Sequence, residues 1–176
     1  MLENIKRISI VGGCGTGKTT LANNLSSTLD LPVCHLDGLH HLKDWEIRDK
    51  TERDEMIIKK INEDKWVIDG TYTSTLDARI ERSDLVIYLD YSSFEQLKGV
   101  LKRFFKNHGK EKEEIPGCKE QMTLEFFLYV LNWRKNKRPN VIKHIEKVDK
   151  KKLLIFKNRG QLNKWYEKEF NKKIII

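Results

Sequence analysis

A glycine-rich loop near the amino end carries the residues with the clearest chemistry. Residues 12 to 19 read GGCGTGKT and fit the pattern G-x-x-x-x-G-K-[ST] without a mismatch. Glycines let successive backbone N–H groups point inward, where they can bind phosphate oxygens. Lys18 can neutralise the β- and γ-phosphates, and the Thr19 hydroxyl can bind Mg²⁺. The residues expected to hold the phosphates are Gly12, Gly13, Cys14, Gly15, Thr16, Gly17, Lys18, Thr19 and Thr20.

Cys14 occupies a free position of this motif, so we expect its backbone N–H to matter more than its sulfur. The loop therefore predicts a site for a nucleoside triphosphate with Mg²⁺.

Three carboxylates follow later apolar runs, in HLDG at Asp37, VIDG at Asp69 and IYLD at Asp90. An aspartate that ends a strand beside a phosphate loop usually completes the Mg²⁺ site, and either Asp69 or Asp90 can fill that role. Asp37 can orient or deprotonate an acceptor hydroxyl, which makes it a catalytic candidate. The structural alternative for each carboxylate is a helix cap or a turn.

Ring-bearing residues lie close to Asp37 and Asp69 in the sequence. His40, His41 and Tyr72 are predicted to be walls of an acceptor pocket, and Trp45 is either a core residue or a stacking surface. Cys34 together with the two histidines is a conceivable metal cluster, but no ligand spacing recurs elsewhere to support it.

Phosphoryl transfer also needs cations over the transferred group and exclusion of water. The catalytic candidates are Arg103, in the basic stretch from 98 to 119, and Arg134 and Arg138, in the cluster RKNKR. The alternative is that these charges only cover solvated helix faces.

The elements that must position these residues alternate along the chain. Apolar runs predict strands at 7–11, 33–36, 66–69, 85–89 and 152–156. Helical spacing is found at 18–29, 50–63, 73–81, 92–107, 122–133, 140–148 and 161–170, and the basic cluster is expected to stop at Pro139. Residues 108–121 are polar and contain Gly and Pro, which predicts a mobile loop. The alternation favours a parallel sheet covered on both faces, with ligands at the carboxyl ends of its strands.

Length and composition indicate one globular domain spanning residues 1–176. Lys and Arg outnumber Asp and Glu by 34 to 26, and the resulting charge of +8 suits an anionic partner, either a nucleotide or a nucleic acid. The three cysteines lack CxxC spacing and are expected to be free thiols. No apolar stretch is long enough to cross a membrane, so we expect a cytoplasmic protein, either monomer or homodimer.

Several segments resemble the nucleoside and nucleotide kinase group of P-loop proteins and, within it, the FlaR-related DNA topology modulation proteins. Besides the phosphate loop, the shared motifs are LPVCHLDGLH, WVIDGTYTSTLDARIERSD, LVIYLD, LKRFFKNHGK, the GC–E of Gly117, Cys118 and Glu120, and FFLYVLNWRKNKRP. The likeness covers nearly the whole chain.

This resemblance implies a three-layer α/β/α fold with a five-stranded parallel sheet in the order 2-3-1-4-5. It also implies a lid at about 106–121, followed by a basic helix end at about 134–138. ATP is the implied phosphate donor, with Asp69 near Mg²⁺ and adenine near 158–160, at Asn158 and Arg159.

Two arginine positions that bind the acceptor in related kinases differ in this chain: one motif arginine is absent and another arginine is present. Adenylate-type kinases follow the third strand with D-G-x-P-R, whereas this chain has DGTYT and its nearest arginine is Arg79. Arg53 falls where related small-molecule kinases place an acceptor-binding arginine.

Three classes of function fit a phosphate loop, and the sequence favours one of them. We predict an ATP- and Mg²⁺-dependent kinase with a small-molecule acceptor, for which a nucleoside and a nucleotide are both candidates. A GTP switch would need N-K-x-D and D-x-x-G elements, which the sequence lacks. A DNA-associated protein, suggested by the family name, stays the alternative. Nucleic acid is nevertheless not the favoured partner, since there is no helix-turn-helix or zinc finger and the basic residues are interspersed with acids.

Overall fold

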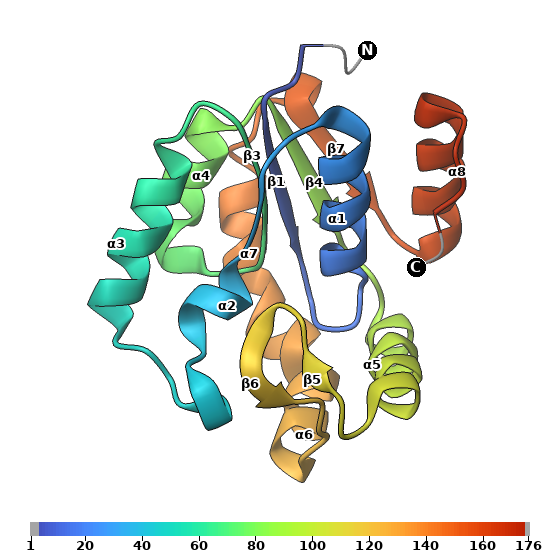
Figure 1. Cartoon of the computed structure of the whole chain (residues 1–176). Coiled ribbons are helices and arrows are strands. Elements are labelled where there is room, and N and C mark those ends of the chain that lie inside the picture. Colours follow the sequence, from blue (N-terminus) through green and yellow to red (C-terminus); the bar gives the residue numbers. More distant parts are fainter. Residues whose placement is uncertain (1–3, 175–176) are drawn as a thin grey trace.

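A parallel sheet forms the centre of the molecule in the computed structural model, which describes residues 4–174 (Figure 1). The strands are β1 (Arg7–Gly12), β2 (Val33–His35), β3 (Trp66–Asp69), β4 (Leu85–Leu89) and β7 (Leu153–Phe156). Their order is β2-β3-β1-β4-β7, and every neighbouring pair is parallel. Because β7 is the fifth strand of this sheet along the chain, the predicted order 2-3-1-4-5 is confirmed.

Helices cover both faces of the sheet and complete the three layers. The α-helices are α1 (Lys18–Leu29), α2 (Leu36–His40), α3 (Lys50–Ile61), α4 (Leu76–Arg82), α5 (Ser93–Asn107), α6 (Leu124–Asn136), α7 (Arg138–Ile145) and α8 (Arg159–Phe170). Short 3-10 turns are η1 (Lys43–Trp45), η2 (Thr73–Thr75) and η3 (Lys150–Lys152). None of the helices described between residues 4 and 174 has the length and apolar character needed to cross a membrane.

Alternating side chains of β1 divide the core between the two faces, as expected for a strand buried on both sides. Ile8 and Ile10 pack with α1 and α8. Val11 packs on the other face with residues of α4, α6 and α7. Each of these β1 side chains is fully buried. The loop that leaves β1 is therefore anchored on a rigid strand.

Several helices begin at a residue whose side chain satisfies a free backbone N–H. Asp49 accepts from Thr51 and Glu52 at the start of α3, and Ser92 accepts from Glu95 at the start of α5. Thr123 and Asn158 cap α6 and α8 in the same way. These local bonds explain why the helix starts could be predicted within a few residues.

The segment predicted as a loop at 108–121 instead contains a two-stranded antiparallel hairpin. Its strands are β5 (Glu111–Lys112) and β6 (Ile115–Lys119). Gly117 has φ +81°, which a glycine adopts without strain, and Ile115 and Cys118 are buried. The prediction of a loop was wrong because the surrounding charges conceal these two core positions.

Two smaller boundaries also differ from the prediction. Leu36 belongs to the short helix α2 and not to the strand before it. The helix expected to begin at residue 140 begins at Arg138, because Pro139 lies in the first turn of α7, where its missing N–H costs no helical hydrogen bond.

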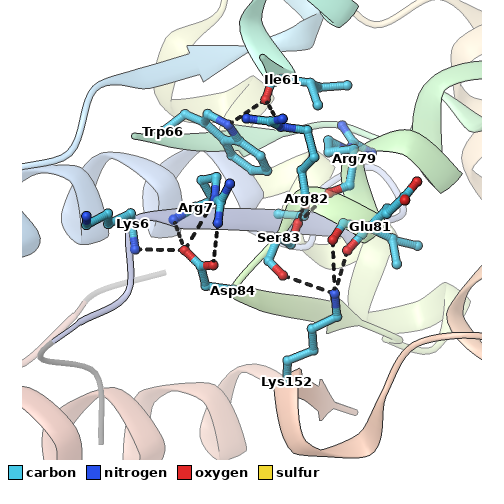
Figure 2. A network of polar contacts seen from close by, with 12 residues as sticks. Lys6, Arg7, Ile61, Trp66, Arg79, Glu81, Arg82, Ser83, Asp84 and Lys152 are labelled. Carbon is cyan, nitrogen blue, oxygen red and sulfur yellow. Dashed lines mark hydrogen bonds and ion pairs between the residues drawn. The ribbon is translucent and has the colours of Figure 1, made fainter. Parts of the chain in front are cut away.

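A network of polar contacts ties the elements together at the amino ends of the strands (Figure 2). Asp84 accepts from the backbone N–H groups of Lys6 and Arg7 and pairs with the Arg7 guanidinium at 3.0 Å. The Lys152 ammonium donates to the carbonyls of Ile80 and Ser83, at 2.8 and 3.1 Å. The charged side chains of this network therefore stabilise the fold by joining neighbouring elements.

Candidate functional site

A cavity of about 750 Å³ opens at the carboxyl ends of the strands. The phosphate loop, α2, η1, the loop after β3, α5, the β5–β6 hairpin and α6 all contribute lining side chains. This is the position where parallel sheets covered by helices bind their ligands.

The phosphate loop has the conformation that its glycines predict. Gly15 and Gly17 have φ of +66° and +89°, and α1 begins directly after Gly17. A Cβ on Gly13 would lie 2.0 Å from the Gln96 side-chain oxygen, and a Cβ on Gly15 would lie 2.4 Å from the Gln96 carbonyl oxygen. Glycine is therefore required both for the backbone angle and for packing against α5.

Two cavity-lining side chains of the loop contribute in different ways. The Lys18 ammonium donates to the Gly13 carbonyl at 2.8 Å, which places its charge over the loop. Burial raises the pKa of the Cys14 thiol, so the thiol is neutral at physiological pH. The Cys14 side chain therefore adds no charge to the site.

Thr19 and Asp69 lie together beside the loop. The Thr19 hydroxyl donates to one carboxylate oxygen of Asp69 at 3.2 Å, and His35 Nδ1 lies 2.5 Å from the other oxygen. Hydroxyl and carboxylate oxygens are the ligands that Mg²⁺ prefers, so this pair fits a magnesium ion held together with a nucleotide. Within residues 4–174, no group of three or more His, Cys, Asp or Glu could hold a metal by itself.

Asp90, the alternative Mg²⁺ partner, lies in a different environment and does not line the cavity. Its carboxylate is buried and accepts from Arg138, Arg134 and Lys157, with distances of 2.7, 2.9 and 2.5 Å. Of the two candidates, it is Asp69 that lies beside Thr19.

The same contacts hold Arg134 and Arg138 away from the cavity lining. A buried carboxylate at the end of β4 needs counter-charges, and these two guanidinium groups supply them. The structure therefore does not bring Arg134 and Arg138 to the phosphate loop, and their catalytic role stays a prediction.

Arg103 does line the cavity, from α5. Its Nε donates to the buried Glu120 carboxylate at 2.9 Å, and Lys112 lies 3.7 Å from the same carboxylate. Lys102 and Lys106 line the cavity from the same helix. Cations therefore gather on the side of the cavity formed by α5 and the hairpin.

Asn158 and Arg159, the residues expected near adenine, differ in what they contact. The Asn158 side chain is used to cap α8. Arg159 lines the cavity, where it donates to the Gly15 carbonyl at 2.5 Å and pairs with Glu95 at 2.6 Å. Arg159 therefore reaches the phosphate loop itself.

Asp37 projects into the cavity from α2. It is exposed to the cavity solvent, although protein surrounds it on most sides, and it accepts a hydrogen bond from the Tyr72 hydroxyl at 2.9 Å. Burial acts to raise the pKa of Asp37, but Lys18 and the Tyr72 hydroxyl outweigh it and hold the pKa below its usual value. Asp37 is therefore ionised at neutral pH and can accept a proton.

The predicted pocket walls His40, His41 and Tyr72 all line the cavity, and Trp45 joins them. Trp45 is half-buried, and its indole N–H donates to the Lys119 carbonyl of the hairpin at 3.2 Å. Asp44 and Trp45 have φ of +57° and +65°, an unusual backbone for two non-glycine residues in succession. The hydrogen bond from Trp45 to the hairpin therefore stabilises the turn in which Asp44 and Trp45 have a strained backbone.

His35 and Thr71 are among the residues of the site that the sequence analysis missed. His35 ends β2 and contacts Asp69, and its position two residues before Asp37 was the available signal. The Thr71 hydroxyl donates to the Gly12 carbonyl at 2.7 Å and accepts from the Gly12 N–H at 3.0 Å. These hydrogen bonds connect the loop after β3 to the start of the phosphate loop. They depend on the pairing of β1 with β3, which no local sequence pattern reveals.

Comparisons with solved structures show the fold. A shikimate kinase from Acinetobacter baumannii, in complex with shikimate, is 17% identical with a TM-score of 0.61, covering 96% of this chain and 92% of that one. A shikimate kinase from Bacteroides thetaiotaomicron is 17% identical with a TM-score of 0.51, covering 96% and 99%. A gluconokinase from Sinorhizobium meliloti 1021 is 12% identical with a TM-score of 0.50, covering 88% and 83%. At such identities the likeness defines a P-loop kinase-like fold and leaves the substrate open.

No family model matches the sequence, and a search of curated proteins found no match.

Proposed function

We propose that this protein transfers the γ-phosphate of ATP to a hydroxyl group of a small molecule. The observation that carries the proposal is one cavity that is lined by both the phosphate loop and an ionised carboxylate, Asp37. The similar folds of shikimate kinases and a gluconokinase support the same class of reaction. Membership of the DNA topology modulation proteins is part of the proposal and rests on the sequence motifs alone.

On the donor side, the loop backbone and Lys18 would bind the phosphates, and Arg159 would hold the loop in place. Thr19 and Asp69 would hold Mg²⁺. When bound with the nucleotide, Mg²⁺ supplies neutralisation of charge on the β- and γ-phosphate oxygens. Arg103, which lines the cavity from α5, would approach the transferred group.

On the acceptor side, Asp37 would accept the proton of the attacking hydroxyl. A lone pair of the hydroxyl oxygen forms the new bond to the γ-phosphorus. The bond from that phosphorus to its bridging oxygen breaks, and its electron pair leaves with ADP. Asp37 then releases its proton to solvent as the products leave, so that the next cycle begins with the carboxylate ionised.

A screen of phosphate acceptors that follows ADP release tests the proposal. Nucleosides, nucleoside monophosphates and hydroxy acids would each be added to the protein with ATP and Mg²⁺. We expect one class to accelerate ADP release, and we expect Lys18→Ala to abolish that acceleration while the circular dichroism spectrum stays unchanged. If no acceptor consumed ATP while duplex DNA bound tightly at physiological salt, the kinase proposal would be abandoned.

A further inference from the structure

Two groups of aromatic side chains line the same cavity as Asp37, and we call the part of the cavity that they line the acceptor half. The first group consists of His40, His41, Trp45 and Tyr72, from the segments that follow β2 and β3. The second consists of Phe126 and Tyr129, from α6. We call these groups the loop wall and the α6 wall. They belong to elements far apart in the sequence, and both line the same cavity as the phosphate loop.

Within each wall the rings pack on one another. In the loop wall, His40 lies 5.2 Å from Tyr72 and His41 lies 5.2 Å from Trp45, measured between ring centres. In the α6 wall, Phe126 and Tyr129 are stacked, with ring centres 6.5 Å apart and planes inclined by 18°. Rings held by neighbouring rings present flat, preorganised surfaces to the cavity.

One hydroxyl group of the loop wall binds Asp37 directly, since the Tyr72 hydroxyl donates to its carboxylate at 2.9 Å. Burial raises the pKa of Tyr129 to about 12, so its phenol is neutral at pH 7. A ring held against Tyr72 would therefore lie close to Asp37.

Positive charge that could bind an anionic acceptor is already paired in this half of the cavity. Arg53, which lies 4.9 Å from the Tyr72 ring, is bound to Asp54 at 2.6 Å and does not line the cavity. Lys112 lines the cavity beside Trp45, but the buried Glu120 carboxylate lies 3.7 Å from its ammonium.

The remaining ionisable groups of this half also disfavour an anion. Burial lowers the pKa of both His40 and His41, so both rings are neutral at pH 7. The carboxylates of Asp37 and Glu114 line the cavity as well and would repel a phosphate or a carboxylate. The other cations that line the cavity come from the phosphate loop, α5 and the start of α8, namely Lys18, Lys102, Arg103, Lys106 and Arg159. Of these, Lys18 also acts on Asp37 and lowers its pKa.

We propose that the acceptor is an uncharged alcohol that carries a planar aromatic ring, the chemical class to which nucleosides belong, and that this ring stacks between the loop wall and the α6 wall. The inference rests on the proposed kinase function and narrows it. An acceptor that already bears a phosphate or a carboxylate is disfavoured, because Asp37 and Glu114 would repel it, Lys112 lies beside the Glu120 carboxylate, and Lys18 is needed for the phosphates of ATP.

Binding without ATP gives the first test. Trp45 and Trp133 line the cavity, so a nucleoside that stacks there should quench tryptophan fluorescence. The probes are adenosine, thymidine and cytidine, with the matching monophosphates and shikimate as anionic comparisons. We expect at least one nucleoside to bind, its monophosphate to bind about tenfold more weakly, and shikimate not to bind. Tighter binding of the monophosphate or of shikimate would overturn the inference.

A matched pair of variants gives the second test. Tyr129 is 41% exposed, so Tyr129→Leu should leave the fold intact while removing one stacking surface. We expect this variant to raise the nucleoside Kd and KM about tenfold, as loss of one ring under a base does, with no change in the KM for ATP. Tyr129→Phe keeps the ring and should therefore retain the stacking affinity for the nucleoside that Tyr129→Leu loses. Equal nucleoside affinity in both variants would contradict the stacking arrangement.

The two tests separate failure of the inference from failure of the proposed function. If nucleosides bind but no acceptor of any class accelerates ADP release, the aromatic site stands and the kinase function fails. If ADP release is accelerated only by anionic or non-aromatic acceptors, the kinase function stands and the inference fails. If nothing binds and nothing is phosphorylated, both fail.

Discussion

The two ends of the parallel sheet use charged residues in opposite ways. At the amino ends, Asp84 binds a backbone N–H group and the Arg7 guanidinium, and Lys152 binds a backbone carbonyl (Figure 2). At the carboxyl ends, Lys18 and Asp37 project into a cavity large enough for substrates. The same residue types thus stabilise the fold at one end and are available to ligands at the other.

Asp90 shows that position alone does not decide this difference. It ends a strand at the carboxyl side, as Asp69 does, yet three cations pair with it and it does not line the cavity. In this protein, whether a charge is already paired distinguishes a ligand-binding group from a structural one better than its place on the sheet does.

Asp37→Asn should have the largest effect and tests the carboxyl end directly. A general base contributes about 10²–10⁴-fold to the rate, so kcat should fall by at least about 100-fold with little change in the KM for ATP. Because the pKa of Asp37 is lowered, the wild-type rate should stay constant from pH 7 to about pH 5 and fall only at more acid pH. Steady-state ADP release at each pH measures both effects.

Asp64→Asn, which changes an exposed carboxylate outside the cavity, is the control for that experiment. Equal loss of activity in the two variants would argue that Asp37 has no special part in the reaction.

Asp69→Asn should have a smaller effect, specific for the metal. Loss of a carboxylate near a bound ion typically costs about 10–100-fold in metal affinity, so turnover should require correspondingly more Mg²⁺. The measurement is ADP release against Mg²⁺ concentration. Thr19→Ser, which keeps the hydroxyl, should leave the Mg²⁺ requirement near that of the wild type, and a large shift in that control would count against the Thr19–Asp69 site.

Asp90→Asn should reduce stability and thereby separate Asp90 from its neighbours at the carboxyl end. Fully buried ion pairs lose about 3–5 kcal/mol when one partner is removed, but these cations are partly exposed, so we expect about 2 kcal/mol at pH 7. Arg138 and Lys157 hold the pKa of Asp90 below its usual range, against the effect of burial. The stabilisation is therefore complete above about pH 4 and is lost as the pH falls further.

Urea unfolding at pH 7 and at pH 3 measures this difference, which should be smaller at pH 3. If Asp90→Asn left unfolding unchanged and abolished turnover, Asp90, Arg134 and Arg138 would have to be assigned to catalysis.

Lys152→Met should have the smallest effect and tests the amino end. Loss of a charged donor to three main-chain carbonyls should cost about 1–2 kcal/mol of unfolding free energy, with kcat and KM unchanged. Exposed Lys151 provides the matched control, because Lys151→Met should alter stability by less than about 0.5 kcal/mol. A loss of activity in Lys152→Met would contradict the conclusion that charges at the amino ends only stabilise the fold.

The prediction of the fold from sequence succeeded where structure depends on neighbouring residues. The bounds of α1, β3 and β4 agree with the expected ones, because apolar periodicity and adjacent turn signals are local properties. The prediction failed at the β5–β6 hairpin, whose buried residues Ile115 and Cys118 lie among charges. Cys118 is held by Leu42 and Trp45, more than 70 positions away, and no local pattern contains that information.

The phosphate loop is what the sequence determined by itself. Its eight consecutive residues encode the glycine turns, the cation and the hydroxyl, because each depends on backbone angles and contacts within the loop or next to it. The tertiary structure decided which other residues join it. Arg134 and Arg138 pair with Asp90 across 44 and 48 positions, while aromatic residues from the loops and from α6 line the same cavity as Asp37. Such partners are chosen by how strands order and helices pack, since a charge or ring contacts whatever the fold places within a few ångströms.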